Sequence, residues 1–139
     1  MYLLDTNVIS ALRRPERLPP AVAQWAGAMN ADEFFISAIS ILEIEQGILA
    51  KARVDAATGE ILRQWFEVDV LIPFEDRIIP VDTEVALKCA ALHVPDRQPE
   101  RDGLIAATAL VHAMTVVTRN VADFERTGVA ILNPWHGIM

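Results

Sequence analysis

Acidic residues stand at four places in this sequence where an apolar run ends or a helix is about to begin. Carboxylate oxygens are hard ligands of the kind that Mg²⁺ and Mn²⁺ prefer. Ions held by such a cluster lower the pKa of a bound water and clamp the oxygens of a phosphodiester during in-line attack. If the fold gathers these residues, they indicate metal-assisted hydrolysis. They are Asp5, Glu43, Asp102 and the neighbouring pair Asn120 and Asp123.

Each of these acids also has a purely local explanation. Asp5 is of a type that favours turns and helix N-caps. Ser40 and Glu43 have the spacing of a capping box, which would place Glu43 in the first turn of a helix. Asp102 near a helix start is favoured by the helix macrodipole, and the segment 120–123 fits an Asx turn. Taken singly, these local explanations are the better ones, and only the shared placement indicates a site.

Small residues lie beside two of the acids. Gly47 follows Glu43 by one helical turn, although Gly costs roughly 1 kcal/mol relative to Ala inside a helix. Ala106 and Ala109 share a helical face with Asp102. Both faces are therefore expected to admit the close approach of another group, which could be a ligand or a second helix.

Short apolar runs alternate with helical patterns along the whole chain. Such alternation predicts βαβ units around a parallel sheet, whose strands all end at the edge where ligands bind. We therefore expect one three-layer α/β/α domain with a central parallel sheet, spanning residues 1–139. The expected strands are 2–4, 34–36, 78–79, 114–118 and 130–132. The expected helices run from 19 or 20 to 29, from 40 onward, from 56 to 66 or 71, from a cap at Asp82 to 92, and from 100 to 112.

Composition indicates an ordinary globular protein. The chain has 139 residues, and 53% of them are apolar. A single cysteine, Cys89, permits no intramolecular disulfide, which suits a reducing cytosol. Asp5 and Asn7 interrupt the N-terminal apolar run, so no signal peptide is expected. The longest uncharged run, 103–118, is shorter than the roughly 20 residues that span a bilayer. We expect a cytoplasmic protein without a membrane segment.

The formal net charge is −7, which argues against a general nucleic-acid binder. That argument weakens if several acids belong to one metal site. Basic residues cluster at Arg13, Arg14 and Arg17, and Arg97 and Arg101 flank a proline-containing loop. These arginines are candidate phosphate contacts, although arginine is also common on surfaces without any function.

Other familiar kinds of catalytic site fit less well. The three histidines have no spacing typical of zinc ligands, and the chain contains neither a glycine-rich phosphate loop nor a GxSxG elbow. A phosphoacceptor domain with Asp5 as nucleophile would need a second acid beside it and a lysine after a late strand. Thr6 and Arg119 occupy those places instead.

Four segments in this order resemble the PIN domain of VapC-type toxins. They are "LLDTNVIS" at the start, "ISAISILEIEQG" at 36–47, "RDGLIAATALVH" at 101–112 and "VVTRNVADF" at 116–124. The closing "NPWHG" and the stretch "FISAI" are similar to the FitB-like branch. The resemblance runs from residue 1 to about 136. It implies a PIN-like α/β/α fold and the activity of a Mg²⁺- or Mn²⁺-dependent ribonuclease.

The resemblance also implies a set of site residues. Asp5, Glu43 and Asp102 match the acidic site of the family. At the position of Asn120 some relatives have Asp, and here Asp123 is expected to supply that charge. The implied metal ligands are thus Asp5, Glu43, Asp102 and Asp123, and polar positions that orient the site are Thr6, Thr118 and Asn120.

The expected function is that of an endoribonuclease toxin from a type II toxin–antitoxin system, which hydrolyses RNA with a metal-activated water. The implied partners are single-stranded RNA or a tRNA loop, a cognate antitoxin protein and a second copy of the chain. The alternative is a catalytically inactive PIN scaffold that only binds proteins. Metal-dependent RNA cleavage by the purified protein distinguishes these two functions.

Overall fold

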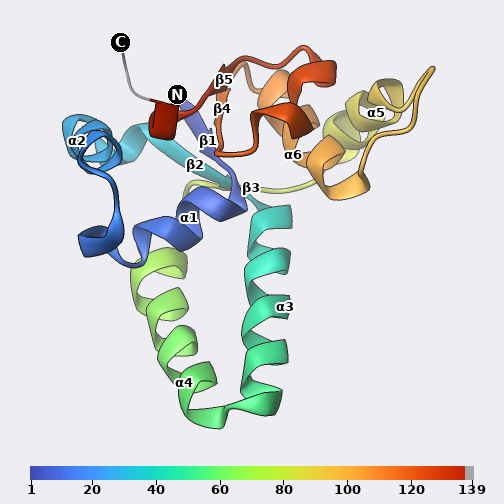
Figure 1. Ribbon diagram of the computed structural model, residues 1–139. Helices are drawn as coiled ribbons and strands as arrows, with labels where there is room; N and C mark the ends of the chain where they lie inside the picture. The colour runs from blue at the N-terminus through green and yellow to red at the C-terminus, as the bar shows by residue number, and fades with distance from the viewer. Residues whose placement is uncertain (137–139) are drawn as a thin grey trace.

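The computed structural model describes residues 1–136 and contains a five-stranded sheet flanked by helices (Figure 1). All paired strands are parallel, in the order β3-β2-β1-β4-β5, so β1 lies at the centre. Gly137, within the "NPWHG" segment, lies outside the described residues. The strands are β1 (Tyr2–Leu4), β2 (Phe34–Ser37), β3 (Ile78–Ile79), β4 (Thr115–Val117) and β5 (Ile131–Leu132).

Helices cover both faces of this sheet, which confirms the expected three-layer α/β/α fold. The α-helices are α1 (Thr6–Leu12), α2 (Pro20–Ala28), α3 (Ala38–Val54), α4 (Ala56–Trp65), α5 (Thr83–Leu92) and α6 (Glu100–Val111). A π-helix, η3 (Phe66–Leu71), continues α4, and five 3₁₀ turns complete the structure: η1 (Pro15–Arg17), η2 (Ala31–Glu33), η4 (Val121–Asp123), η5 (Glu125–Thr127) and η6 (Pro134–His136). Within residues 1–136, no helix is long and apolar enough to cross a membrane.

Alternating residues of β1 enter two separate cores, as the two-residue period of a strand requires. Leu4 packs with residues of α1, α2, α3 and η3 on one face. Leu3 packs on the other face with α6, where Ile105 is fully buried. Helix α5 is one layer further out, with Cys89 and Val85 packed against Ala107. Both faces of β1 are therefore buried, as expected for the central strand of a parallel sheet.

The long helix α3 begins earlier than its sequence predicts, and the predicted capping box is wrong. Strand β2 runs directly into the helix, so Ser37, with extended φ and ψ, takes the cap position and accepts from the Ile39 N–H at 3.1 Å. Ser40 is consequently buried inside the first turn, and Glu43 lies in the second turn rather than the first. The cap predicted at Asp82 is confirmed, because its carboxylate accepts from the Val85 N–H at 3.0 Å.

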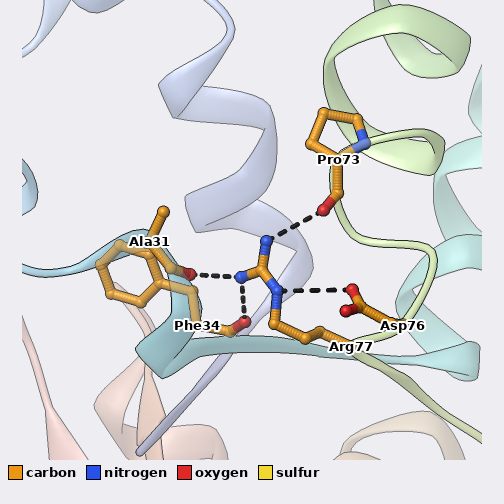
Figure 2. A network of polar contacts seen from close by, with 5 residues as sticks. All are labelled: Ala31, Phe34, Pro73, Asp76 and Arg77. Atoms are coloured by element: carbon orange, nitrogen blue, oxygen red, sulfur yellow. Dashed lines mark hydrogen bonds and ion pairs between the residues drawn. The ribbon is translucent and has the colours of Figure 1, made fainter.

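Arg77 attaches the edge strand β3 to the rest of the sheet (Figure 2). Its guanidinium donates to the carbonyl oxygens of Phe34, at 2.7 Å, Pro73, at 2.9 Å, and Ala31. The Arg77 carbonyl in turn accepts from the Ile36 N–H at 3.0 Å. One side chain thus satisfies backbone carbonyls of both the loop before β3 and the entry to β2, which fixes the start of a two-residue strand.

The small residues beside the acids do not mark a close approach by another part of this chain. A Cβ on Gly47 would have no neighbour within 4 Å. Ala106 and Ala109 are fully buried and pack against the sheet, so their size reflects helix–sheet packing. The close approach occurs instead at Gly59 of α4, where an added Cβ would lie 2.5 Å from Ala52 Cβ and 2.6 Å from its Cα.

Substitutions of these two helical glycines should have opposite effects on stability. Gly59→Ala forces α4 away from the α3 backbone, and we expect the free energy of unfolding to fall by about 1–3 kcal/mol. Gly47→Ala, which meets open space, should raise it by roughly 0.5–1 kcal/mol. Urea unfolding of both variants tests this. Equal effects of the two substitutions would contradict the close α3–α4 contact.

Candidate active site

The predicted site residues gather at the carboxyl edge of the central strands. Asp5 directly follows β1, and its N–H donates to the Val117 carbonyl of β4 at 2.9 Å. Glu43 comes from α3, which follows β2 on the other side of β1, and Asp102 comes from the first turn of α6. Asp123 lies in η4, just after β4. Four segments far apart in sequence therefore supply one group of carboxylates.

Asp5 is buried, with 6% of its surface exposed, and both of its oxygens accept hydrogen bonds. Oδ1 accepts from the Thr6 N–H at 2.8 Å, which makes Asp5 the N-cap of α1 as local reasoning suggests. Oδ2 accepts from the Thr118 hydroxyl at 2.8 Å and from Asn7 Nδ2 at 3.1 Å. Burial raises the pKa of Asp5, although these hydrogen bonds oppose the rise, and the charges of Glu43 and Asp123 add to it.

Thr6 connects the start of α1 to the carboxylate on α3. Its hydroxyl donates to Glu43 Oε1 at 2.7 Å and lies 2.9 Å from the buried Ser40 hydroxyl. The second oxygen of Glu43, Oε2, is 3.8 Å from Arg101 Nη1 on α6. The Glu43 side chain is therefore held from two sides, by a hydroxyl and by a guanidinium.

The pKa of Asp102 depends on burial and on the charges of the other three acids. Partial burial raises its pKa from 3.8 to about 6, and the charges of Asp123, Asp5 and Glu43 contribute in that order. Each of the other three acids thus raises the pKa of this carboxyl. The local macrodipole explanation would predict the opposite direction, since a helix N-terminus favours the ionised form.

Asn120 and Asp123 have different places in this arrangement. The Asn120 N–H donates to the Thr118 hydroxyl at 2.9 Å, but its side chain does not cap η4, so the expected Asx turn does not form. Asp123 is exposed, yet its charge is the largest electrostatic contribution to the raised pKa of Asp102. Of this pair, Asp123 is therefore the residue whose charge raises the pKa of Asp102 and of Asp5.

The donor set suits a hard divalent cation, although its members are not arranged as a closed coordination shell. In the part of the chain that the structure describes, no three His, Cys, Asp or Glu side chains are close enough together to hold a metal ion. The pKa of Asp102 is nevertheless raised, first by burial and then by the charges of the other three acids. Across residues 1–136, Arg101 is the one cation that forms an ion pair with any of the four acids. Oxygen ligands with surplus negative charge fit such an ion.

Sequence reasoning missed two residues of the site and gave a third a different role. The sequence marks Asn7 only as a polar residue that interrupts an apolar run, but its amide N–H donates to Asp5 and its oxygen accepts from the Arg119 N–H at 3.3 Å. Ser40 was expected to cap a helix, and it lies against Thr6 instead. Arg101 was a candidate phosphate contact and faces Glu43. No local signal identifies the contacts of Asn7 with Arg119, of Ser40 with Thr6 and of Arg101 with Glu43, because each joins segments far apart in sequence.

Neutralising Asp102 should stabilise the metal-free protein in a pH-dependent way. The folded carboxyl has a pKa of about 6 against 3.8 for the unfolded chain, so the folded state binds the proton more tightly. The resulting stabilisation is complete below pH 3.8 and is lost as the pH rises through about 6. The melting temperature of Asp102→Asn in EDTA should therefore match that of wild type at low pH and exceed it at neutral pH.

Asp32→Asn, which alters an exposed acid at the opposite end of β2, is the matched control and should show no such pH-dependent gain. A neutral-pH melting temperature of Asp102→Asn below that of wild type would instead assign Asp102 to the helix macrodipole, which is worth roughly 0.3–1 kcal/mol.

Two known proteins are similar in sequence to nearly the whole of this chain. The chain is 35% identical to Toxin FitB from Neisseria gonorrhoeae, over 98% of this chain and 99% of that protein. It is 34% identical to VapC ribonuclease Y4jK from Sinorhizobium fredii, over 97% and 98% of the two chains.

Solved structures show the same architecture over the full length. A chain in the structure of FitAB bound to an IR36 DNA fragment superposes with a TM-score of 0.87 at 34% identity, covering 100% of this chain and 99% of that one. The family model of the PIN domain matches residues 2–130. The chain therefore belongs to the PIN domain family.

Proposed function

We propose that this chain, as one domain over residues 1–139, is a metal-dependent endoribonuclease and the toxin of a type II toxin–antitoxin pair. The observation that carries the proposal is the placement of Asp5, Glu43, Asp102 and Asp123 at one edge of the sheet. Burial and the charges of the other three acids together raise the pKa of Asp102 to about 6, which agrees with this placement. Relatives that match nearly the whole chain support it, because they are named a toxin and a ribonuclease.

The four carboxylates, Asp5, Glu43, Asp102 and Asp123, are the proposed ligands of Mg²⁺ or Mn²⁺. A bound ion of this kind lowers the pKa of a coordinated water and offsets charge on a phosphodiester. Among the acids, Asp5 is the most rigidly held, since hydrogen bonds fix both of its oxygens.

The polar residues around these acids have a positioning role in this proposal. Thr118 orients Asp5 and is itself held by the Asn120 N–H, which explains why position 120 can be Asn. Thr6 orients Glu43 through its hydroxyl. These contacts hold the carboxylates near one another despite their repulsion, so that ligand geometry is partly set before an ion or RNA arrives.

The proposed partners are RNA, a cognate antitoxin and a second copy of the chain, and the proposed location is the cytoplasm. A toxin–antitoxin complex from Klebsiella pneumoniae contains a chain of the same fold, with a TM-score of 0.67 at 24% identity. A group of acids with surplus negative charge would accept an Arg or Lys from an inhibitor, through charge-assisted hydrogen bonds.

Substitution of the acids tests the catalytic proposal. We expect Asp5→Asn, Glu43→Gln and Asp102→Asn each to reduce RNA cleavage by about 100-fold or more, because the acids act as one unit. Asp123→Asn should cost less, since this side chain is exposed. Cleavage of single-stranded RNA is measured in Mg²⁺ or Mn²⁺ and in EDTA, with Asp32→Asn as the control.

Cleavage by wild type that persists in EDTA would disprove the metal role. No cleavage under any condition, by folded protein with an unchanged melting temperature in millimolar Mn²⁺, would instead support the inactive scaffold. A metal-dependent rise in melting temperature, smaller in Asp5→Asn than in wild type, reports ion binding independently of activity.

The quaternary prediction is a homodimer that forms a tight heterocomplex with the antitoxin. Light scattering at micromolar concentration should give twice the mass of the chain, and the heterocomplex should lose RNA cleavage. A strictly monomeric protein under these conditions would contradict the dimer without bearing on the acids.

A further inference from the structure

A polar cavity of about 270 Å³, which we call the arginine cavity, lies near the acids. Its basic lining consists of Arg13, Arg14, Arg17 and Arg119, and Trp135 forms part of its wall. The chain has 12 lysines and arginines in total and a net charge of −7, so a third of its basic residues face one cavity in an acidic protein. Such local concentration of positive charge attracts anions even where the whole molecule repels them.

The positions of these arginines are set by backbone structure. Arg13 ends α1, and Arg14 precedes η1, where its carbonyl accepts from the Arg17 N–H at 2.9 Å. Arg119 comes from the other side of the cavity, directly after Thr118. In the described residues, none of the four forms an ion pair with a carboxylate. Their charge is therefore available to an anion from outside the chain.

Arg119 and Trp135, which both line the cavity, form a cation–π pair. The guanidinium carbon of Arg119 lies 5.3 Å from the centre of the Trp135 ring, within the range of a cation–π contact. The backbone N–H of Trp135 donates to Asn133 Oδ1 at 3.0 Å, which fixes the main chain at the start of η6. Trp135 is half-buried, so part of it stays accessible. Unpaired RNA bases stack on both kinds of plane.

The arginine cavity neighbours the acidic site. The Arg119 N–H donates to Asn7 Oδ1, and Asn7 Nδ2 donates to Asp5 Oδ2, so a single side chain links the two. The cavity also shares Ser10 and Arg13 with a groove of about 360 Å³ that reaches Thr6 and Glu43. A polymer that crosses the acids would therefore meet the arginines next.

We propose that the arginine cavity binds single-stranded RNA beside the cleavage site, with phosphates on Arg13, Arg14 and Arg17 and one base against the Arg119–Trp135 pair. This inference rests on the proposed ribonuclease function and adds a substrate-positioning surface to it. An acidic protein segment could form ion pairs with the arginines, but its carboxylates would not stack on the ring of Trp135. Single-stranded RNA satisfies both, because it offers phosphates and exposed bases together.

The test compares RNA binding by two double arginine variants. Arg14→Ala/Arg17→Ala removes two charges from the cavity, and Arg53→Ala/Arg126→Ala removes two charges elsewhere on the surface. Fluorescence anisotropy of a short labelled single-stranded RNA of mixed sequence is measured in EDTA across a range of salt. The cavity variant should bind about tenfold more weakly, with its salt slope reduced by about 1.4. The control variant should bind like wild type.

A third variant tests the stacking contact. Trp135→Leu should weaken RNA binding by about tenfold without changing the salt slope, whereas Trp135→Phe should retain most of the affinity. Melting temperatures identify any loss of folding, and Arg119→Ala, which removes the other plane, provides a variant outside the apolar core. In cleavage assays with Mg²⁺, the Arg14→Ala/Arg17→Ala variant should raise KM and leave kcat within about twofold of wild type.

Equal RNA binding by the cavity and control variants, with wild-type cleavage, would overturn the inference and leave the ribonuclease proposal intact. Weaker binding of a labelled polyglutamate peptide, with RNA binding unchanged, would assign the cavity to an acidic protein partner and likewise overturn it. Failure of wild type to cleave any RNA would overturn the ribonuclease proposal, and the binding comparison would still decide whether the cavity takes RNA.

Discussion

The buried carboxylate of Asp5 is the constraint on which the rest of this site depends. A charged group in the interior is costly unless hydrogen bonds replace the water that it has lost. Here the backbone of Thr6, the hydroxyl of Thr118 and the amide of Asn7 supply those bonds. Thr6 and Asn7 directly follow Asp5 in the chain, and the pairing of β1 with β4 places Thr118 beside the end of β1. Asp5 can therefore cap α1 and belong to an acidic site at once, because its two oxygens face different partners. The local and the functional explanations of this residue are not alternatives.

The place of β1 in the sheet explains why the other acids come from such distant parts of the chain. In the order β3-β2-β1-β4-β5, the neighbours of β1 are β2 and β4, and the segments after these strands flank Asp5 on both sides. Helix α3 leaves β2 without a connecting loop, since Ser37 is both the last residue of the strand and the cap of the helix. That direct transition moves Glu43 into the second turn, from which it reaches Thr6. A helix starting at Ser40, as the sequence pattern suggested, would have placed Glu43 elsewhere.

What the sequence predicts well is what depends on local pattern. Apolar runs such as 2–4 and 34–36 are strands because both of their faces are buried, and Asp82 caps α5 through its own neighbours. The acids were identified as a group because strand ends share one edge in a parallel sheet. Tertiary contacts were not accessible in this way. The packing of Gly59 on Ala52, the open space beside Gly47 and the bridge that Asn7 forms from Asp5 to Arg119 all depend on how two separate elements meet. The choice between Ser37 and Ser40 as cap depended on where β2 ends, which neither serine determines alone.

The acids repel the phosphates of RNA and the arginines attract them. The proposed function therefore requires that the two groups be separated. Carboxylates that bind a cation repel a phosphate until the ion is present, so a strand needs another source of attraction to approach them. Arginines placed among the acids would pair with them, as Arg101 does with Glu43, and would compete with the ion. The arginines of the cavity, of which Arg119 contacts Asn7, form no ion pair within residues 1–136 and can attract the strand without neutralising the ligands. A net charge of −7 is then compatible with RNA binding, because a short-range arrangement of charge decides the affinity when salt screens interactions beyond about 10 Å.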